Sequence, residues 1–347
     1  MLITISRKLE DLVRKIGLVI IDVAVGTLWF IDRATSFTFR QAVRFVKKFT
    51  VVIVATGGLV ALGYFLYSGY LNTLFGYILL DKITQSQSSF ITYPARVRYL
   101  PAPETSAKSV LVMERQKGKI LYEKNANDRL APASTVKLLT ALVVLDLYSS
   151  SEELKVPKEC TEIEGTKAGF PKGSVFMVGD LVNSMLVGSL GDSACVLASG
   201  RVTNGDFVAL MNKKAVSIGM SSTRVTNPIG LDDDNGGNYS TASDLYKLAV
   251  YATNVPQIKD DVKTPMYILN ASKEKYSGII YNTNKFLWEI PNTVGIKTGT
   301  TAGAGEVLIY EYNDGPRDVI IVVMGSTDRF ADTKNILDWV LASYAWK

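Results

Sequence analysis

The stretch DRLAPASTVKLLTALVVLDL, residues 128–147, places a hydroxyl and an amine at the start of a long apolar run. Pro132 stands just ahead of that run and predicts the beginning of a helix. Ser134 and Lys137 are three residues apart, so on a helix they share one face and the amine can reach the hydroxyl. The pattern predicts a serine nucleophile with a lysine base, the alternative being a helix-start serine and a solvated lysine.

The residues after this pair favour the catalytic interpretation. The run LLTALVVLDL predicts a buried helix, and burial lowers the pKa of a lysine toward the value that a general base needs. A serine at a helix N-terminus also lies near free backbone N–H groups, which favour developing negative charge. The same spacing recurs in SKEK, residues 272–275, within a polar stretch, so spacing alone is a weak signal.

The composition narrows the choice of catalytic base. The chain of 347 residues carries a formal charge of +5 and contains no histidine. A Ser-His-Asp triad is therefore impossible, as is a zinc site with imidazole ligands, and lysine is the remaining candidate base. The two cysteines, Cys160 and Cys195, are too few for a disulfide framework or a four-cysteine metal site, and we interpret them as two small buried hydrophobic residues.

Residues 50–80, TVVIVATGGLVALGYFLYSGYLNTLFGYILL, contain no charged residue. About 20 apolar residues suffice to cross a bilayer, so we expect a transmembrane helix that contacts the lipid bilayer here. Residues 1–49 carry nine basic residues against four acidic ones. Because basic flanks stay inside, the sequence predicts a single-pass protein of the cell membrane with a cytoplasmic N-terminus and an extracytoplasmic C-terminal domain.

The segments on either side of the predicted span differ in character. In the basic cytoplasmic segment 1–49, the piece Ile16–Ile31 is apolar but interrupted by Asp22. We interpret it as an amphipathic helix on the membrane surface, with a second span as the alternative. Residues 81–105 are polar and contain three prolines, which predicts an extracytoplasmic linker to the domain 106–347.

The domain at 106–347 has predicted strands toward both ends, is helical between them and closes with a further helix. Two strands joined by a turn at Gln116–Gly118 come first, and three more are predicted within residues 292–325. Apolar residues at helical spacing predict helices in residues 179–200, 204–220, 240–254 and 329–346. Ser240 or Thr241 caps the third of these helices. This order indicates an α+β fold with one sheet and a helical subdomain.

Two more short motifs carry chemistry. GIKTGTT, residues 295–301, places Lys297 on a predicted strand as a fixed positive charge and Thr298 as a hydrogen-bond donor. Gly299 lets a substrate backbone lie close to such a strand, although an edge strand with a solvated lysine is the alternative. GSLGDSA, residues 188–194, contains Ser189 on a helical segment, where a hydroxyl bonded to its own helix is the alternative.

The three motifs match a known set in order and spacing. SxxK, SDN and KTG together are the signature of penicillin-binding proteins and class A β-lactamases. Ser189 follows Ser134 by 55 residues, and Lys297 follows Ser189 by 108 residues. Together the motifs are specific where each alone is not.

From about Lys108 to Trp346, the chain resembles the low-molecular-weight penicillin-binding proteins, the serine-type D-alanyl-D-alanine carboxypeptidases. Besides the motifs, the resemblance lies in GKILYEKNANDRLAPAS, FVALMNKKAVSIGM, NPIGLDDDNGGNYSTASDL, NTNKFLW and MGSTDRFADTKNILDW. It implies a β-lactamase/transpeptidase-like domain, in which helices flank an antiparallel sheet beside a helical subdomain. The implied reaction removes the terminal D-Ala from a peptidoglycan stem pentapeptide through an acyl-enzyme, and β-lactam antibiotics would acylate the same serine. No cofactor, metal or nucleic-acid partner is implied.

The resemblance also implies roles for single residues. Ser134 would be the acylated nucleophile, Lys137 its base, and Ser189 a proton relay to the leaving group. The implied substrate-binding residues are Lys297, Thr298, Gly299, Thr300 and Arg329. Lys297 and Thr298 would hold the C-terminal carboxylate of the substrate, with Arg329 adding charge unless it is only a helix-start arginine in solvent. The backbone N–H groups of Ser134 and Thr300 would form the oxyanion hole, worth roughly 3–4 kcal/mol per donor in comparable enzymes.

The chain departs from the family pattern at Gly191, which stands where the second motif of the family has an asparagine. Glycine offers no carboxamide to the lysine or the substrate, so a catalytically impaired peptidoglycan-binding protein is one alternative. A β-lactamase is another, although no motif marks Glu162 or Glu164 as the activator of a deacylating water. A DD-endopeptidase that cuts D-Ala-containing cross-links is a third, because the same residues can serve both reactions.

Overall fold

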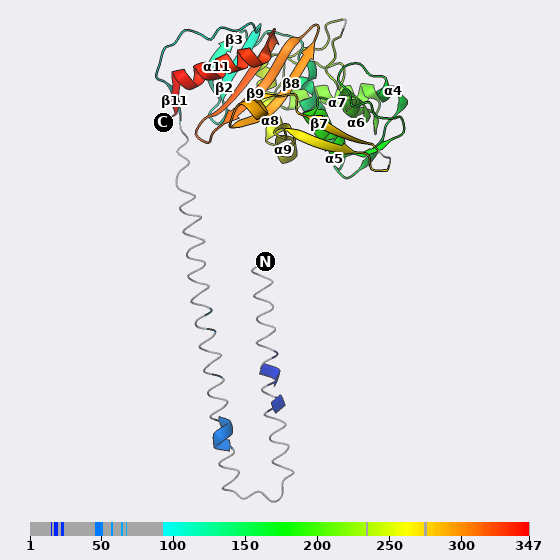
Figure 1. The fold of residues 1–347 in the computed structure, drawn as a ribbon, viewed down its shortest axis with the longest axis vertical. Helices are drawn as coiled ribbons and strands as arrows, with labels where there is room; N and C mark the ends of the chain where they lie inside the picture. Colours follow the sequence, from blue (N-terminus) through cyan, green and yellow to red (C-terminus); the bar gives the residue numbers. More distant parts are fainter. Residues whose placement is uncertain are drawn as a thin grey trace, which may run out of the picture. The chain divides into compact units, whose positions relative to one another are not determined.

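The computed structural model in Figure 1 describes residues 93–233, 235–273 and 276–346. Helical pieces ahead of them are described at residues 15, 17–19, 22–23, 46–50, 57, 64 and 67. Apart from these pieces, the predicted segment 1–49, the predicted span 50–80 and linker residues 81–92 lie outside the described residues. None of the helices in the described part of the chain combines the length and apolar character that a membrane crossing requires. The chain divides into two units, Met1–Ser88 and Ser89–Lys347, and the fold below is that of the second.

The second half of the predicted linker contacts the folded domain. Strand β1 (Pro94–Arg96) pairs antiparallel with β11 (Tyr344–Trp346) near the end of the chain. The indole Nε1 of Trp339 donates a hydrogen bond of 2.6 Å to the carbonyl oxygen of Pro101. The folded unit therefore includes residues ahead of position 106.

A five-stranded antiparallel sheet, ordered β3-β2-β10-β9-β8, forms the centre of the domain (Figure 1). Its strands are β2 (Ser109–Glu114), β3 (Lys119–Lys124), β8 (Thr293–Thr301), β9 (Gly305–Asn313) and β10 (Asp318–Ser326). Both ends of the domain contribute to it, as predicted, because β2 pairs with β10 and places Glu114 opposite Val319. The motif strand β8 lies at one edge of the sheet, where its outer side is not paired with another described strand.

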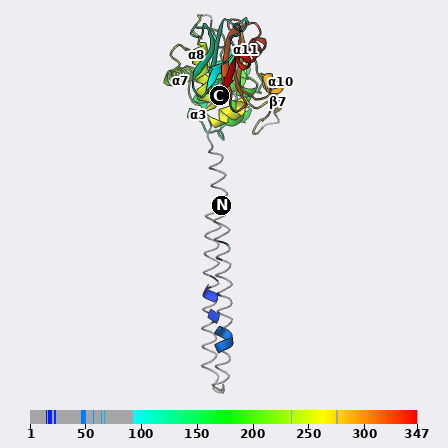
Figure 2. The same cartoon turned by 90° about the vertical axis from the view of Figure 1, so that its left-hand side faces the viewer.

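Alternating apolar residues give the sheet two buried faces. On one face Val110 and Val319 pack in the same cluster as Ile336 of α11 (Arg329–Ser343). On the other face Leu111 and Val322 join the core of the helical subdomain. Figure 2 shows α8 and α11 on opposite sides of the sheet. Period-2 alternation on central strands explains this layering, because successive side chains point to opposite faces.

The helical subdomain surrounds one buried helix, α3 (Lys137–Leu147). The other helices of the subdomain are α4 (Lys158–Thr161), α5 (Val178–Val187), α6 (Gly191–Ser199), α7 (Asn204–Ser217), α8 (Ala242–Thr253) and α9 (Pro256–Val262). The short helix α10 (Phe286–Glu289) instead places Phe286 in the cluster on the α11 side of the sheet. Every residue of α3 from Lys137 to Val144 is buried, which confirms the burial predicted from its apolar run. Thr241 caps α8 by accepting a 3.1 Å hydrogen bond from the backbone N–H of Asp244, one of the two predicted alternatives. Two short hairpins complete the subdomain: β4 (Glu153–Lys155) with β5 (Val175–Met177), and β6 (Met266–Asn270) with β7 (Ser277–Tyr281).

The interpretation of the cysteines was wrong. Cys160 in α4 and Cys195 in α6 form a disulfide with a Cα–Cα distance of 5.5 Å. The prediction failed because a separation of 35 residues says nothing about whether two cysteines meet in the fold. Closing a loop of this length contributes on the order of 3–4 kcal/mol to stability in the chain-entropy model.

Candidate active site

Ser134 lies in η1 (Ala133–Val136), a single turn of 3₁₀ helix between Pro132 and α3. Ala133 adopts the left-handed region with φ of 49°. Two glycines allow neighbouring segments to pack closely against both sides of this turn. A Cβ on Gly230 would lie 2.1 Å from the carbonyl oxygen of Ala133, and one on Gly299 of β8 would lie 2.9 Å from the backbone nitrogen of Ser134. The turn is therefore fixed between the 227–231 loop and the motif strand.

Lys137 reaches Ser134 as the helical spacing predicted. Its Nζ donates 2.7 Å hydrogen bonds to Ser134 Oγ and to the carbonyl oxygen of Ile229. Only 1% of Lys137 is exposed, which excludes the solvated-lysine alternative. Burial lowers the pKa of Lys137 to about 7, while the nearby negative charge of Asp192 acts in the opposite direction. A large fraction of the amine is thus neutral near neutral pH and able to accept a proton.

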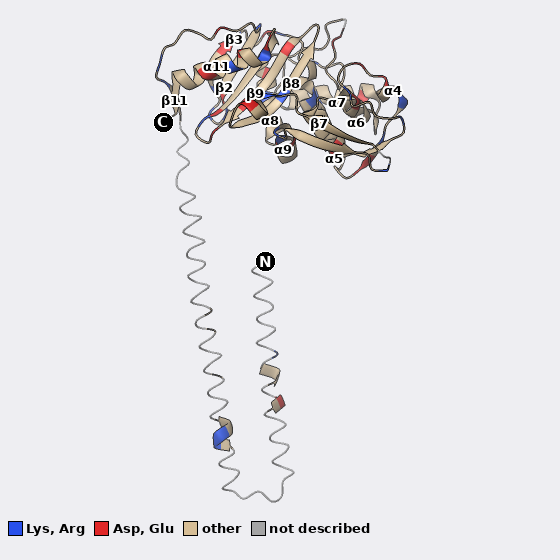
Figure 3. Cartoon of the chain, viewed as in Figure 1, with Lys and Arg blue, Asp and Glu red and all other residues tan. Residues whose placement is uncertain are grey.

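Lys297 on β8 is the second buried amine of the site. Figure 3 shows acidic and basic residues interspersed over the domain. Lys297 is one of its buried charged residues, with only 1% of its surface exposed. Burial lowers the pKa of Lys297 well below its usual range, and the positive charges of Lys137 and Arg329 lower it further. Lys297 is therefore not the solvated lysine of an ordinary edge strand, and it shares an electrostatic environment with Lys137.

The remaining residues of the motif strand connect to two other elements. Thr298 Oγ1 shares a 2.5 Å hydrogen bond with Oγ1 of Thr283, a residue that sequence reasoning did not single out. Arg329 begins α11, and its Nη1 donates hydrogen bonds to the carbonyl oxygen of Gly299, at 3.1 Å, and to Thr300 Oγ1. Its side chain is thus attached to the strand instead of lying free in solvent, and burial lowers its pKa.

Ser189 lies elsewhere than predicted. It is part of the connection between α5 and α6, in the left-handed region with φ of 58°, and not on a helix. Its residue is 8% exposed, and its hydroxyl makes no hydrogen bond with any residue that the structure describes. The alternative of a hydroxyl bonded to its own helix is therefore not observed, and the predicted proton relay is not preformed in this state.

The space beside Gly191 is filled by another segment. Its backbone N–H donates a 2.7 Å hydrogen bond to the carbonyl oxygen of Thr166. A Cβ on Gly191 would lie 2.7 Å from Ile163 Cδ1 and 3.3 Å from Ile229 Cγ2. A glycine at this position therefore permits the close approach of the segment that carries Ile163 and Thr166, two residues that sequence reasoning missed.

The two polar residues after Gly191 do not replace the missing asparagine. The buried carboxylate of Asp192 accepts hydrogen bonds from the backbone N–H groups of Gly169, at 2.9 Å, and Ser193, at 3.0 Å. Ser193 Oγ shares a 2.9 Å hydrogen bond with Ser184 Oγ. Both side chains are thus used to hold α6 and its neighbours, and neither bonds to the two lysines.

Ile229 is another member of the candidate site that the motifs did not reveal, because it contributes a backbone carbonyl. Asn227 shapes the loop that presents it: its Oδ1 accepts hydrogen bonds from the N–H groups of Ile229 at 3.2 Å, Gly230 at 2.7 Å and Leu231 at 3.0 Å. The dipeptide Asn227-Pro228, with Gly230 two residues after it, is a turn signal in the sequence. No sequence signal shows that this turn meets Lys137, 92 residues earlier.

Comparisons with known proteins identify the family of the chain. The family model described as D-alanyl-D-alanine carboxypeptidase, peptidase family S11, matches residues 97–328. The chain belongs to this family. The D-alanyl-D-alanine carboxypeptidase DacF of Bacillus subtilis is 30% identical over 249 residues, which cover 69% of this chain and 63% of DacF. This chain therefore spans less than two thirds of that relative's length.

Two further similar proteins carry other names. The D-alanyl-D-alanine endopeptidase of Escherichia coli is 32% identical over 69% of this chain and 78% of its own. The ampicillin-bound structure of penicillin-binding protein D2 from Listeria monocytogenes superposes with a TM-score of 0.62 and 29% identity, over 70% of this chain and 100% of that chain. The predicted α+β penicillin-binding fold is thereby confirmed for the described domain.

Proposed function

We propose that this protein is a serine D-alanyl-D-alanine carboxypeptidase that removes the terminal D-Ala from peptidoglycan stem pentapeptides. The observation that carries the proposal is the 2.7 Å hydrogen bond from a buried Lys137 to Ser134 Oγ. A hydroxyl held by an amine whose pKa is about 7 is an activated nucleophile, since the amine can take the hydroxyl proton as attack proceeds. Membership of the carboxypeptidase family supports the same reaction.

Acylation follows from these positions. Lys137 accepts the proton of Ser134 Oγ while the oxygen attacks the carbonyl carbon of the penultimate D-Ala. The backbone N–H groups of Ser134 and Thr300 stabilise the oxyanion. The C–N bond then breaks, the proton passes to the leaving amine with Ser189 as relay, and D-Ala departs. Water subsequently attacks the acyl-enzyme, and the C–O bond to Ser134 breaks to regenerate the hydroxyl.

The substrate carboxylate binds beside the motif strand. Lys297, Thr298 and Arg329 supply positive charge and a hydroxyl donor there, with Gly299 allowing the peptide backbone to lie close to the strand. β-Lactams enter by the same route and acylate Ser134. The ampicillin-bound Listeria relative, similar over 70% of this chain, supports that part of the proposal.

An endopeptidase activity is the second candidate. It is favoured by the Escherichia coli relative named D-alanyl-D-alanine endopeptidase, which is 32% identical. Both reactions use an acyl-enzyme and differ only in the leaving group, a free D-Ala or a cross-linked peptide amine. Digestion of a cross-linked muropeptide beside a pentapeptide separates the two.

We also propose that the domain works outside the cytoplasm, anchored in the cell membrane through residues 50–80. The uncharged run of the sequence and the basic residues ahead of it support this placement. The Cys160–Cys195 disulfide supports it as well, because disulfides persist mainly in oxidising compartments.

The test is intact-mass analysis of the full chain after incubation with benzylpenicillin, alongside Ser134→Ala. We expect one covalent adduct on the wild type, none on the variant, and release of D-Ala from a pentapeptide by the wild type only. Folded wild type without adduct or D-Ala release contradicts the proposal and favours a peptidoglycan-binding role. Loss of penicillin without an accumulating adduct favours a β-lactamase.

A further inference from the structure

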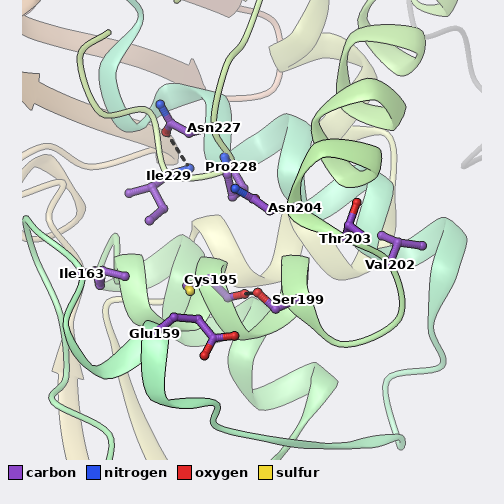
Figure 4. Close-up of a pocket in the computed structure, with 10 residues that line it drawn as sticks. All are labelled: Glu159, Ile163, Cys195, Ser199, Val202, Thr203, Asn204, Asn227, Pro228 and Ile229. Carbon is purple, nitrogen blue, oxygen red and sulfur yellow. Dashed lines mark hydrogen bonds between the residues drawn. The ribbon is translucent and has the colours of Figure 1, made fainter. Parts of the chain in front are cut away.

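A cavity of about 410 Å³ runs along α6 between α4, the start of α7 and the 227–231 loop (Figure 4). Its lining residues are Glu159, Ile163, Cys195, Ser199, Val202, Thr203, Asn204, Asn227, Pro228 and Ile229. Half-buried Cys195 forms part of the cavity wall, whereas its disulfide partner Cys160 is fully buried. A small molecule in the cavity therefore approaches the disulfide from the Cys195 side.

The disulfide fastens a loop to α6. The hairpin β4–β5 closes the base of this loop by pairing Lys155 with Val175. Within the loop, Cys160 is bonded covalently to α6, and residues 162–173 continue over the start of that helix. Noncovalent contacts of these residues with α6 include the hydrogen bonds from Gly191 N–H to the Thr166 carbonyl and from Gly169 N–H to the Asp192 carboxylate. The backbone of Ala168 and Phe170 also bonds to that carboxylate.

Contacts lead from this loop to the catalytic pair. Ile163 of the loop and Ile229 lie against the same face of Gly191, at 2.7 Å and 3.3 Å from the position of a Cβ there. The carbonyl oxygen of Ile229 accepts hydrogen bonds from Lys137 Nζ, at 2.7 Å, and from Ser134 Oγ, at 3.4 Å. A displaced loop thus takes Ile163 out of the packing around Gly191 and Ile229, and Ile229 positions both catalytic groups.

We propose that the Cys160–Cys195 disulfide is a modification site for small thiols, which reach it through the α6 cavity, and that its reduction slows acylation of Ser134. This inference rests on the proposed function. In the first step a thiolate attacks Cys195 Sγ, a new S–S bond forms, and Cys160 leaves as a thiolate that takes a proton from water. In the second step the other thiol of a dithiol displaces Cys195. The dithiol is oxidised to its cyclic disulfide and the cysteine pair is reduced, with two electrons and two protons transferred.

We expect reduction to disturb the positions of Ser134 and Lys137 without removing either catalytic group. Reduced protein keeps Ser134 and Lys137, but its loop is no longer joined covalently to α6. We expect the second-order rate of acylation by benzylpenicillin to fall about tenfold or more, because small displacements of positioning groups carry penalties up to about a hundredfold.

The experiment compares the full chain before and after treatment with dithiothreitol under native conditions. The chain has only two cysteines, so thiol counting by alkylation and intact mass reports this disulfide alone. Slower acylation on reduction, restored on re-oxidation, supports the proposal. A reduced protein that is acylated at the original rate overturns it, as does a disulfide that dithiothreitol reaches only after unfolding.

The variant Cys160→Ala/Cys195→Ala is the matched control. We expect this variant to be acylated at the rate of the reduced wild type, and dithiothreitol should not change that rate. If dithiothreitol slows acylation of the variant further, the effect on the wild type cannot be assigned to the disulfide. Should this variant fail to fold, the reversible reduction of the wild type decides the question.

Hydrogen exchange gives a readout that does not depend on activity. The amide protons of Gly169 and Gly191 bond across the loop–α6 contact, so their exchange should accelerate on reduction. If exchange of these amides does not change on reduction, the disulfide does not hold the loop against α6. An oxidised wild type that is never acylated contradicts the proposed function, and the exchange result then still tests the anchor by itself.

Discussion

Lys137 Nζ lies 2.7 Å from Ser134 Oγ, and only 1% of the surface of Lys137 is exposed. The same nitrogen is bonded to the Ile229 carbonyl at 2.7 Å, so a chain segment 92 residues away in sequence sets its direction. A base in this position has two requirements, a low pKa and a fixed distance from the hydroxyl, and the fold meets them through burial and through a backbone acceptor.

Lys137→Met removes the amine and keeps an unbranched apolar side chain. We expect the rate of acylation by benzylpenicillin to fall by about two to four orders of magnitude, the usual contribution of general acid–base catalysis. Stopped-flow or quenched mass measurements give this rate. The exposed Lys172→Met is the matched control and should leave the rate unchanged; equal rates in both variants would exclude Lys137 as the base.

The pH dependence of acylation should report Lys137. Its pKa is lowered to about 7, and the neutral form that accepts a proton predominates above that value. The rate should therefore rise roughly tenfold per pH unit at lower pH and level off near pH 7. Asp192→Asn should move the midpoint to lower pH, since it removes the charge that raises this pKa. A profile that is flat between pH 5 and 8 contradicts the assignment, because it shows no group titrating near 7.

Gly191→Asn restores the asparagine of the family motif, but the fold leaves no room for its side chain. The new Cβ meets Ile163 Cδ1 at 2.7 Å and the Thr166 carbonyl oxygen at 3.3 Å. We expect the free energy of unfolding to fall by about 1–3 kcal/mol, as for other overpacked sites. Adding Ile163→Ala should recover part of the loss, and urea unfolding of the two single variants and the double variant measures the coupling. Strict additivity would show that Ile163 does not occupy this space.

Gly230→Ala should displace the nucleophile. A Cβ at this position would lie 2.1 Å from the Ala133 carbonyl oxygen, which is backbone and cannot rotate away. The matched control is Gly236→Ala, where φ is a similarly left-handed 65° and no atom lies within 4 Å. Both variants carry the backbone strain, so a loss of acylation about a hundredfold greater in Gly230→Ala isolates the clash at the Ser134 turn. Equal losses would mean that strain alone is responsible.

Local patterns in the sequence were sufficient for the strands of the central sheet, the buried helix after Lys137 and the pairing of Ser134 with Lys137, but not for the short hairpins or the break between α5 and α6. The apolar run after Lys137 required a buried helix, the spacing of Ser134 and Lys137 required a shared face, and alternating residues near the end of the chain required sheet strands. The SxxK and KTG motifs then indicated the family. These features depend on residues close together in the chain, where period and propensity act.

Only the tertiary structure decided which distant segments complete the site. The Ile229 carbonyl meets Lys137, Ile163 fills the space beside Gly191, and Cys160 meets Cys195, although each pair is separated by tens of residues. Ser189, predicted on a helix, lies in the connection between α5 and α6. The physical reason is that such contacts arise from the packing of whole elements against one another, and no local period in the sequence records where two loops come to rest.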